Sequence, residues 1–312
     1  CNDMQQAGKE SMGRLYRKDR PFFADAERFA ELININLYQG EKVLVPENLR
    51  LMQRKYPSLG SESGENERDV MMLDKGHHIC YGLEIETESD YSMPERVFVY
   101  DACEYEYQIK AIHKKHIREK DYKHYREKKS RIKGSDFLLP IITVVLYLGE
   151  EGWTGRNTLL QMFHKAAGAD KISERYIREY GFPLIEVHKV KPEDYQTELR
   201  EFFQAMHCRE DRKRMMQLLQ TERFQNLSAE TEQAIAVHLH MKGLIEKMEK
   251  EGVPMCKAIR DWMEEERREG QKEGKREEKI YIIRRMIEEG MDEHFIRKIT
   301  QCTKTEFAAA GK

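Results

Sequence analysis

The stretch that decides the fold is Glu67-Arg68-Asp69-Val70-Met71-Met72-Leu73, then a polar run over residues 74–78, then Ile79-Cys80-Tyr81-Gly82-Leu83-Glu84-Ile85-Glu86. Two apolar segments separated by a short polar run predict two β-strands joined by a turn. Side chains two apart on a strand point to the same face, so Glu84 and Glu86 project together. The second strand is therefore expected to bury one face and to end in two aligned carboxylates.

Asp69 stands at the start of the first predicted strand, and pairing of the two strands brings it beside Glu84 and Glu86. Carboxylate oxygens are the ligands that a hard divalent cation such as Mg²⁺ prefers. Such an ion can activate water and stabilise charge when a phosphodiester bond is hydrolysed. From the residues alone the alternative stays open that these acids only mark the solvated end of a strand, because Asp and Glu are common on protein surfaces.

Composition limits the class of protein. The chain has 312 residues, 35% of them charged, and a net charge of −2. Its six cysteines form no CxxC pair and no zinc-like spacing with histidine, which favours reduced thiols and a cytoplasmic protein. No apolar run reaches the ~18 residues of a membrane span, so no membrane partner is expected. No glycine-rich phosphate loop or nucleophile elbow is present.

The pattern along the chain predicts an α/β core followed by a helical, charged C-terminal region. Residues 137–148 are apolar on both faces and β-branched, which is typical of a fully buried strand. After residue 194 almost every pattern is helical. The expected divisions are a poorly ordered segment over residues 1–20, a core over 21–192, a helical region over 193–263, and a charged helix with a terminal helical hairpin over 264–312.

A helix is expected to begin near Pro94 and to continue through residues 110–133, with Arg96 on a turn that lies close to the carboxylates. The segment 110–133 holds eleven Lys or Arg against three acids, a local balance of +8. Such a segment can neutralise phosphates, although a solvated helix face explains the same charges. Two of its residues, His113 and His116, are expected to be exposed. The candidate DNA contacts are Lys114, Lys115, Arg118, Lys123, Lys128 and Lys129.

Several ordered blocks resemble one known family, the Rpn recombination-promoting nucleases, which are often labelled transposases and belong to the PD-(D/E)XK nuclease superfamily. The hairpin with the run that follows it to Ala102 resembles the centre of that family. Earlier and later blocks are also similar. These blocks are Arg28-Phe-Ala-Glu-Leu32, Gly40-Glu-Lys-Val-Leu-Val-Pro-Glu47, Leu139-Pro-Ile-Ile-Thr-Val-Val-Leu-Tyr-Leu-Gly149 and Trp153-Thr-Gly155. The resemblance covers about residues 22–190.

This resemblance implies a restriction-endonuclease-like core, a central mixed sheet flanked by helices, and Mg²⁺-dependent cleavage of double-stranded DNA. Asp69 matches the family's strand acid, Glu84 matches the first acid of its E-x-Q or E-x-K element, and Glu31 matches an acid on the first helix that completes the metal shell. Glu86 departs from the family, which has Gln or Lys there. A glutamate adds negative charge, binds metal directly, or serves as the general base for the water.

We therefore expect a cytoplasmic, metal-dependent DNA endonuclease, linked to recombination or mobile elements. Its catalytic residues are Asp69, Glu84 and Glu86, and its metal ligands are Asp69, Glu84 and Glu31. A homodimer is compatible with this function because cutting both strands needs two sites or two successive cuts. The alternative is a catalytically degenerate protein of the same fold that binds DNA or a protein partner without cutting. A purely helical interaction protein fits residues 194–312 but gives the buried strand no role.

Overall fold

A computed structural model describes residues 20–52, 55–57, 65–163, 176–239 and 255–310 of the chain. The chain divides into two compact units, residues 1–242 and 243–312, and each is described by itself. The residues expected to form the poorly ordered start of the chain lie almost entirely outside the described ranges.

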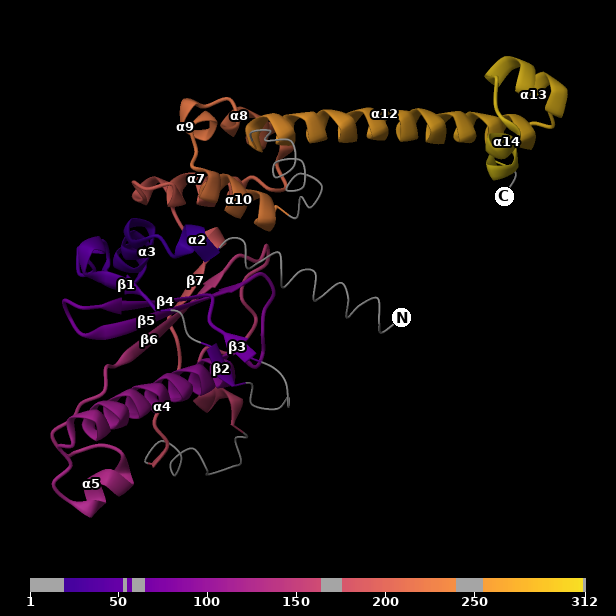
Figure 1. Cartoon of the computed structure of the whole chain (residues 1–312). Helices are drawn as coiled ribbons and strands as arrows, with labels where there is room; N and C mark the ends of the chain where they lie inside the picture. The colour runs from indigo at the N-terminus through magenta and orange to yellow at the C-terminus, as the bar shows by residue number, and fades with distance from the viewer. Residues whose placement is uncertain (1–19, 53–54, 58–64, 164–175, 240–254, 311–312) are drawn as a thin grey trace. The chain divides into compact units, whose positions relative to one another are not determined.

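The first unit is built on a mixed five-stranded sheet with the strand order β1-β4-β5-β6-β7 (Figure 1). The pairs β1–β4 and β4–β5 are antiparallel, whereas β5–β6 and β6–β7 are parallel. The strands of this sheet are β1 (Leu49–Leu51), β4 (Val70–Asp74), β5 (Ile79–Glu86), β6 (Ile141–Tyr147) and β7 (Leu184–Glu186). A separate antiparallel pair is formed by β2 (Lys55–Pro57) and β3 (Glu65–Glu67).

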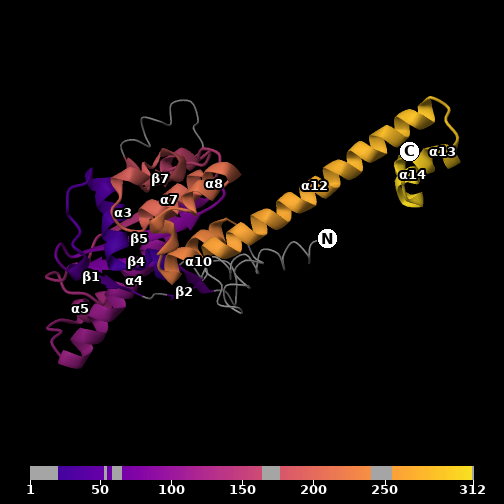
Figure 2. The same cartoon turned by 90° about the horizontal axis from the view of Figure 1, so that it is seen from above.

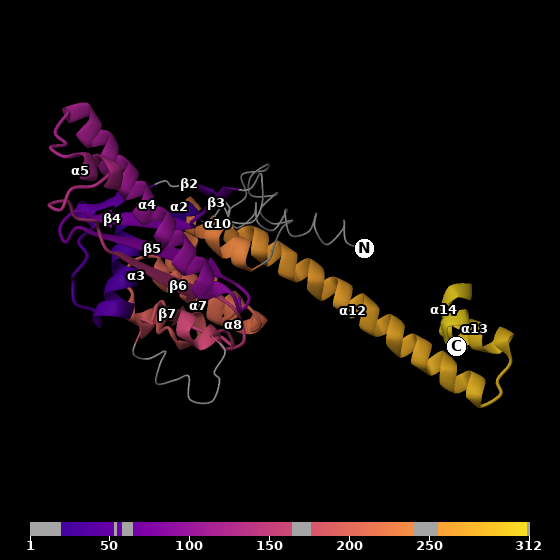
Figure 3. The ribbon, with the colours of Figure 1, turned by 90° about the horizontal axis from the view of Figure 1, so that it is seen from below.

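Helices cover both faces of the sheet. The long helix α4 lies along one face, as Figure 3 shows from below, and the opposite face carries the helices α2, α3, α7 and α10 (Figure 1). The helices of this unit are α2 (Arg20–Phe23), α3 (Ala26–Tyr38), α4 (Met93–Glu119), α5 (Tyr125–Ser130), α7 (Leu199–His207), α8 (Arg212–Leu218), α9 (Glu222–Gln225) and α10 (Ala229–His238). Short 3₁₀ turns are η1 (Pro46–Asn48), η2 (Leu159–Met162), η3 (Val187–Lys189) and η4 (Pro192–Asp194). The coarse prediction, an α/β protein with a mixed sheet between helices, is confirmed.

Two apolar layers hold these helices on the sheet. On the α4 face, Met93 and Val97 pack with Val145 of β6 and with Phe182. On the other face, aromatic rings of α2 and α7 meet, with the centroids of Phe22 and Phe202 5.1 Å apart. Residues of α7, which lies beyond residue 192, therefore contribute to the core of the first unit.

Two expected boundaries are wrong. The helix that begins at Met93 ends at Glu119, because Lys120 takes a left-handed conformation with a φ of 53° that stops an α-helix. The buried strand starts at Ile141, and Phe137 is 86% exposed. Apolar character alone extended that strand too far towards its N-terminal end.

The described residues of the second unit form the helices α12 (Met255–Glu288), α13 (Glu293–Thr300) and α14 (Lys304–Ala310). Both short helices fold back beside the end of α12 (Figure 2). A small apolar cluster of Ile283, Ile296 and Ala310 holds them there. None of the helices in the described ranges of the chain is both long enough and apolar enough to cross a lipid bilayer.

Candidate functional site

Three carboxylates gather at the end of the β4–β5 hairpin. The register pairs Val70 with Leu83, so Asp69, directly before β4, lies opposite the end of β5. Its Oδ2 accepts a hydrogen bond of 2.8 Å from the backbone N–H of Ile85. Because Ile85 lies between Glu84 and Glu86 in the strand, the backbone bond fixes Asp69 beside both acids. The expected juxtaposition of these three residues is confirmed.

Glu84 is a buried acid with an incompletely satisfied carboxylate. Only 2% of the residue is exposed, and its Oε1 has no hydrogen-bond partner. The nearest cations are Arg68, 4.0 Å from Oε1, and Arg96, 3.8 Å from Oε2. Burial, reinforced by the charge of Asp69, raises the pKa of Glu84 to about 8. A group in this state binds a cation or a proton in preference to remaining a bare carboxylate.

Arg96 of α4 is the cation of this cluster. Its guanidinium lies 2.9 Å from a carboxylate oxygen of Glu86 and donates a hydrogen bond of 2.7 Å to Asp90. Burial lowers the pKa of Arg96, but the charges of Glu86 and Glu84 outweigh that effect and hold it above its ordinary value. Burial also raises the pKa of Glu86, against the opposing charge of Arg96, to about 7. The expected approach of Arg96 is confirmed.

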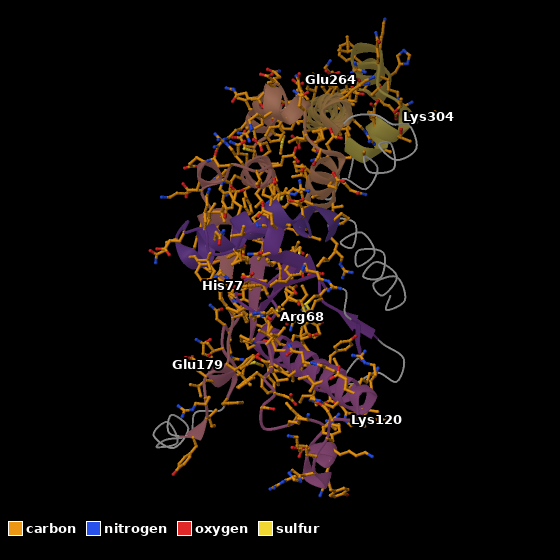
Figure 4. The ribbon with its side chains drawn as sticks, turned by 60° about the vertical axis from the view of Figure 1, so that its left-hand side comes forward. Arg68, His77, Lys120, Glu179, Glu264 and Lys304 are labelled. Atoms are coloured by element: carbon orange, nitrogen blue, oxygen red, sulfur yellow. The ribbon has the colours of Figure 1, made fainter. Side chains whose placement is uncertain are left out.

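A second arginine supports the acids from beneath. Arg68, between the sheet and α4 in Figure 4, donates a hydrogen bond of 2.6 Å to Thr143 of β6 and pairs with Asp101 of α4. Asp101 also accepts a hydrogen bond from the hydroxyl of Tyr180. The guanidinium crosses β5 at Gly82, where an added Cβ would lie 2.2 Å from its Nη1. Only glycine leaves room for this buried network, which fixes α4 and β6 around the carboxylates.

Glu31 is engaged at another place in the fold. It lies on α3, and its carboxylate accepts hydrogen bonds from the backbone N–H groups of Gln196 and Thr197, at 2.6 and 3.0 Å. It therefore satisfies the turn that precedes α7. Its predicted part in a metal shell would require these bonds to open.

The donor set at the hairpin fits a hard divalent cation. Asp69, Glu84 and Glu86 supply carboxylate oxygens, and the buried Oε1 of Glu84 lacks a hydrogen-bond partner. Their present arrangement is set by Arg96 and by the N–H of Ile85. Among the residues that the structure describes, no three His, Cys, Asp or Glu side chains are already arranged as a ligand group. Metal binding would thus require Arg96 to give up at least part of its contact with the acids.

The candidate DNA contacts form a basic arm made of the end of α4, the segment after it, and α5. Arg131 anchors this arm with a hydrogen bond of 2.7 Å to Glu106 of α4. Lys120, at the turn of the arm, is labelled in Figure 4. All six predicted contacts are exposed, namely Lys114, Lys115, Arg118, Lys123, Lys128 and Lys129.

One expectation in the arm is wrong. His116 is only 5% exposed, since its two ring nitrogens lie 2.7 Å from Asp121 and 2.9 Å from Asp136. The carboxylates of Asp136 and Asp121 accept hydrogen bonds from these ring nitrogens and raise the pKa of His116. His113 is partly buried and bonds to Tyr122 at 2.8 Å. The segment after α4 folds back over both rings, which helical spacing does not reveal.

Sequence reasoning missed Arg68, Thr143 and Tyr180. Each comes from a different segment, and no local pattern joins them. The one available signal was Arg68 itself, a charge beside an otherwise apolar strand. Comparisons with known proteins add no relative: no family model, curated protein or solved structure matches this chain.

Proposed function

We propose that this protein is a Mg²⁺-dependent DNA endonuclease with a restriction-endonuclease-like core, as the resemblance to the Rpn nucleases implies. The observation that carries the proposal is the buried carboxylate of Glu84, which lies beside Asp69 and Glu86 and whose Oε1 has no hydrogen-bond partner. Burying like charges together is unfavourable unless a cation joins them. A strained acid cluster at the end of a central strand is typical of a functional site.

In this proposal Asp69 and Glu84 hold the ion through their carboxylate oxygens. Mg²⁺ held there would supply Lewis acidity to the phosphate and to the attacking water. Glu86 would accept the proton of the attacking water on its carboxylate. Arg96, once turned from the acids, stabilises the negative charge that develops on the phosphate. Where the family has Gln or Lys at position 86, Arg96 of α4 would supply the positive charge in this protein.

The basic arm would hold the DNA backbone. Phosphate contacts by Lys and Arg position a duplex without reading its sequence. The basic arm begins at the C-terminal end of α4, and Arg96, near the N-terminal end of the same helix, contacts the acid cluster. Helix α4 therefore links the residues that would contact the DNA backbone to the site that would cut it.

Purified protein with Mg²⁺ should convert supercoiled plasmid into nicked and linear forms. Asp69→Ala should abolish this cleavage, whereas Glu47→Gln, at an exposed acid on η1, should leave it unchanged. Circular dichroism establishes that both variants are folded. Cleavage that persists in a folded Asp69→Ala protein would refute the site.

The contact of Arg96 with Glu84 and Glu86 favours a second candidate, a protein that binds DNA without cutting it. If the guanidinium keeps its place permanently, no ion enters. Calorimetric titration with Mg²⁺ distinguishes the two candidates: the endonuclease takes up Mg²⁺ and loses it on Glu84→Ala, whereas the non-cutting protein binds DNA but no Mg²⁺.

A further inference from the structure

A cavity of about 450 Å³ opens where strands β5 and β6 end. Its wall begins at Thr87, the residue after Glu86, and continues through Ser89 and Tyr91. The segment from Tyr147 to Thr154 forms the facing wall, and Arg209 and His238 complete it. Since a strand advances ~3.3 Å per residue, the cavity starts one residue beyond the carboxylate cluster. Its volume lies in the range of pockets that hold small organic molecules, roughly 300–1,000 Å³.

The walls of this cavity are tied together by hydrogen bonds. The backbone N–H of Thr154 donates to Ser89 Oγ at 3.0 Å, which joins the two facing segments. Arg209 donates to the carbonyl oxygen of Leu148 at 2.7 Å. Trp153 donates its backbone N–H to Glu186 at 3.0 Å. These hydrogen bonds connect the ends of the three parallel strands β5, β6 and β7 and thereby hold the walls of the cavity in place.

Charge and aromaticity limit what the cavity accepts. Three acids, Glu88, Glu150 and Glu151, face one arginine, whose Nε lies 3.4 Å from Glu150. The balance is negative, which disfavours a phosphate group and favours a neutral ligand that donates hydrogen bonds. Tyr91, 63% exposed, offers an aromatic surface at the cavity. A planar ring with an amino group meets both conditions.

We propose that this cavity receives the base of an unpaired nucleotide beside the phosphodiester bond that is cut, with the base stacked on Tyr91. The inference rests on the proposed endonuclease activity and names its substrate class, DNA with a nucleotide outside the stack. Adenine, cytosine and guanine carry amino groups for the acids, and thymine does not. Moving a base into a pocket costs least where the nucleotide is already unpaired.

The cleavage test uses duplexes that differ by one unpaired nucleotide. Wild-type protein with Mg²⁺ should cut a duplex with an unpaired adenosine about tenfold faster than the fully paired duplex, and an unpaired thymidine should give a smaller gain. Tyr91→Ala should remove the preference. Tyr281→Ala, which changes a tyrosine of equal 63% exposure in the other unit, should keep it. Equal rates on bulged and paired duplexes, or a preference that survives Tyr91→Ala, would overturn the inference.

A second readout separates this inference from the endonuclease proposal. Trp153 lies against Tyr147, with ring centroids 5.1 Å apart, so its fluorescence reports on the cavity. In a Trp262→Phe background without metal, adenosine should change this fluorescence and thymidine should do so only at higher concentration. An adenosine response lost in Tyr91→Ala supports the base site even if no DNA is cut, which would refute the endonuclease alone. No response with adenosine overturns the base site, whatever the cleavage result.

Discussion

Replacing Glu84 with Gln should stabilise the metal-free protein at alkaline pH. The change removes a buried charge and keeps the shape of the side chain, of which 2% is exposed. Both nearby arginines retain an ion pair after the substitution, Arg68 with Asp101 and Arg96 with Asp90. The substitution therefore isolates the free energy of burying one carboxylate.

The magnitude follows from the pKa. Burial, with the charge of Asp69, raises the pKa of Glu84 from 4.5 to about 8. Below pH 4.5 the group is protonated in both the folded and the unfolded states and has no effect. Between pH 4.5 and 8 the unfolded chain ionises first, so the free energy of unfolding falls as the pH rises, by roughly 5 kcal/mol in total. Above pH 8 the loss is complete.

Urea denaturation in EDTA, at pH 5.0 and pH 8.5, measures this difference. Trp153 fluorescence in a Trp262→Phe background follows the unit that contains the site. The free energy of unfolding of Glu84→Gln should exceed that of the parent by several kcal/mol at pH 8.5 and by much less at pH 5.0. The control Glu47→Gln should have the same free energy of unfolding as the parent at both pH values. Adding Mg²⁺ should stabilise the parent and not Glu84→Gln. If Glu84→Gln is no more stable than its parent at pH 8.5, the claim that ionised Glu84 destabilises the folded protein is refuted.

Three further changes test the surroundings of the site. Gly82→Ala should lower the free energy of unfolding, measured by urea denaturation, by roughly 3–5 kcal/mol because its Cβ would displace Arg68 from its buried partners. The control Gly134→Ala, whose Cβ would have no atom within 4 Å, should change it little. Arg96→Gln removes a charge that lowers the pKa of Glu84, a proposed metal ligand, so the pH midpoint of calorimetric Mg²⁺ binding should move alkaline by about one unit. An unchanged midpoint, as expected for Arg156→Gln, would contradict this. Changing Lys128 and Lys129 to Ala should reduce the salt slope of DNA binding, measured by fluorescence anisotropy, by about two, and an unchanged slope would exclude the arm from the contact.

The hairpin could be predicted from sequence because its information is local. Alternation over residues 83–86 placed Glu84 and Glu86 on the same face of β5, and the polar run predicted the turn that contains His77 (Figure 4). The carboxylate juxtaposition then followed from strand pairing alone. The expectation that β5 buries only one face is wrong, because residues 80–84 are all buried under helices on both faces of the sheet. The parallel strand β6 was recognisable because a strand covered by helices on both faces is apolar throughout.

Contacts between distant segments could not be predicted. Arg68 donates a hydrogen bond to Thr143, which lies 75 residues later in the sequence. Tyr180 donates a hydrogen bond to Asp101, the partner of Arg68, across a separation of 79 residues. His116 was misjudged for the same reason, since its burial depends on Asp136, 20 residues later. Periodicity indicates which face of an element is buried, but not which polar side chain of another segment meets it.

Glu86 and Arg96 together change what the departure at position 86 means. Considered alone, a glutamate in place of Gln or Lys adds negative charge to a site that already holds two carboxylates. The structure puts a guanidinium 2.9 Å from that glutamate, brought by the first turns of α4. Part of the negative charge is thereby offset by a side chain ten residues away in sequence. Position 86 is therefore one half of a charged pair, and in the proposed endonuclease its effect on cleavage would depend on Arg96.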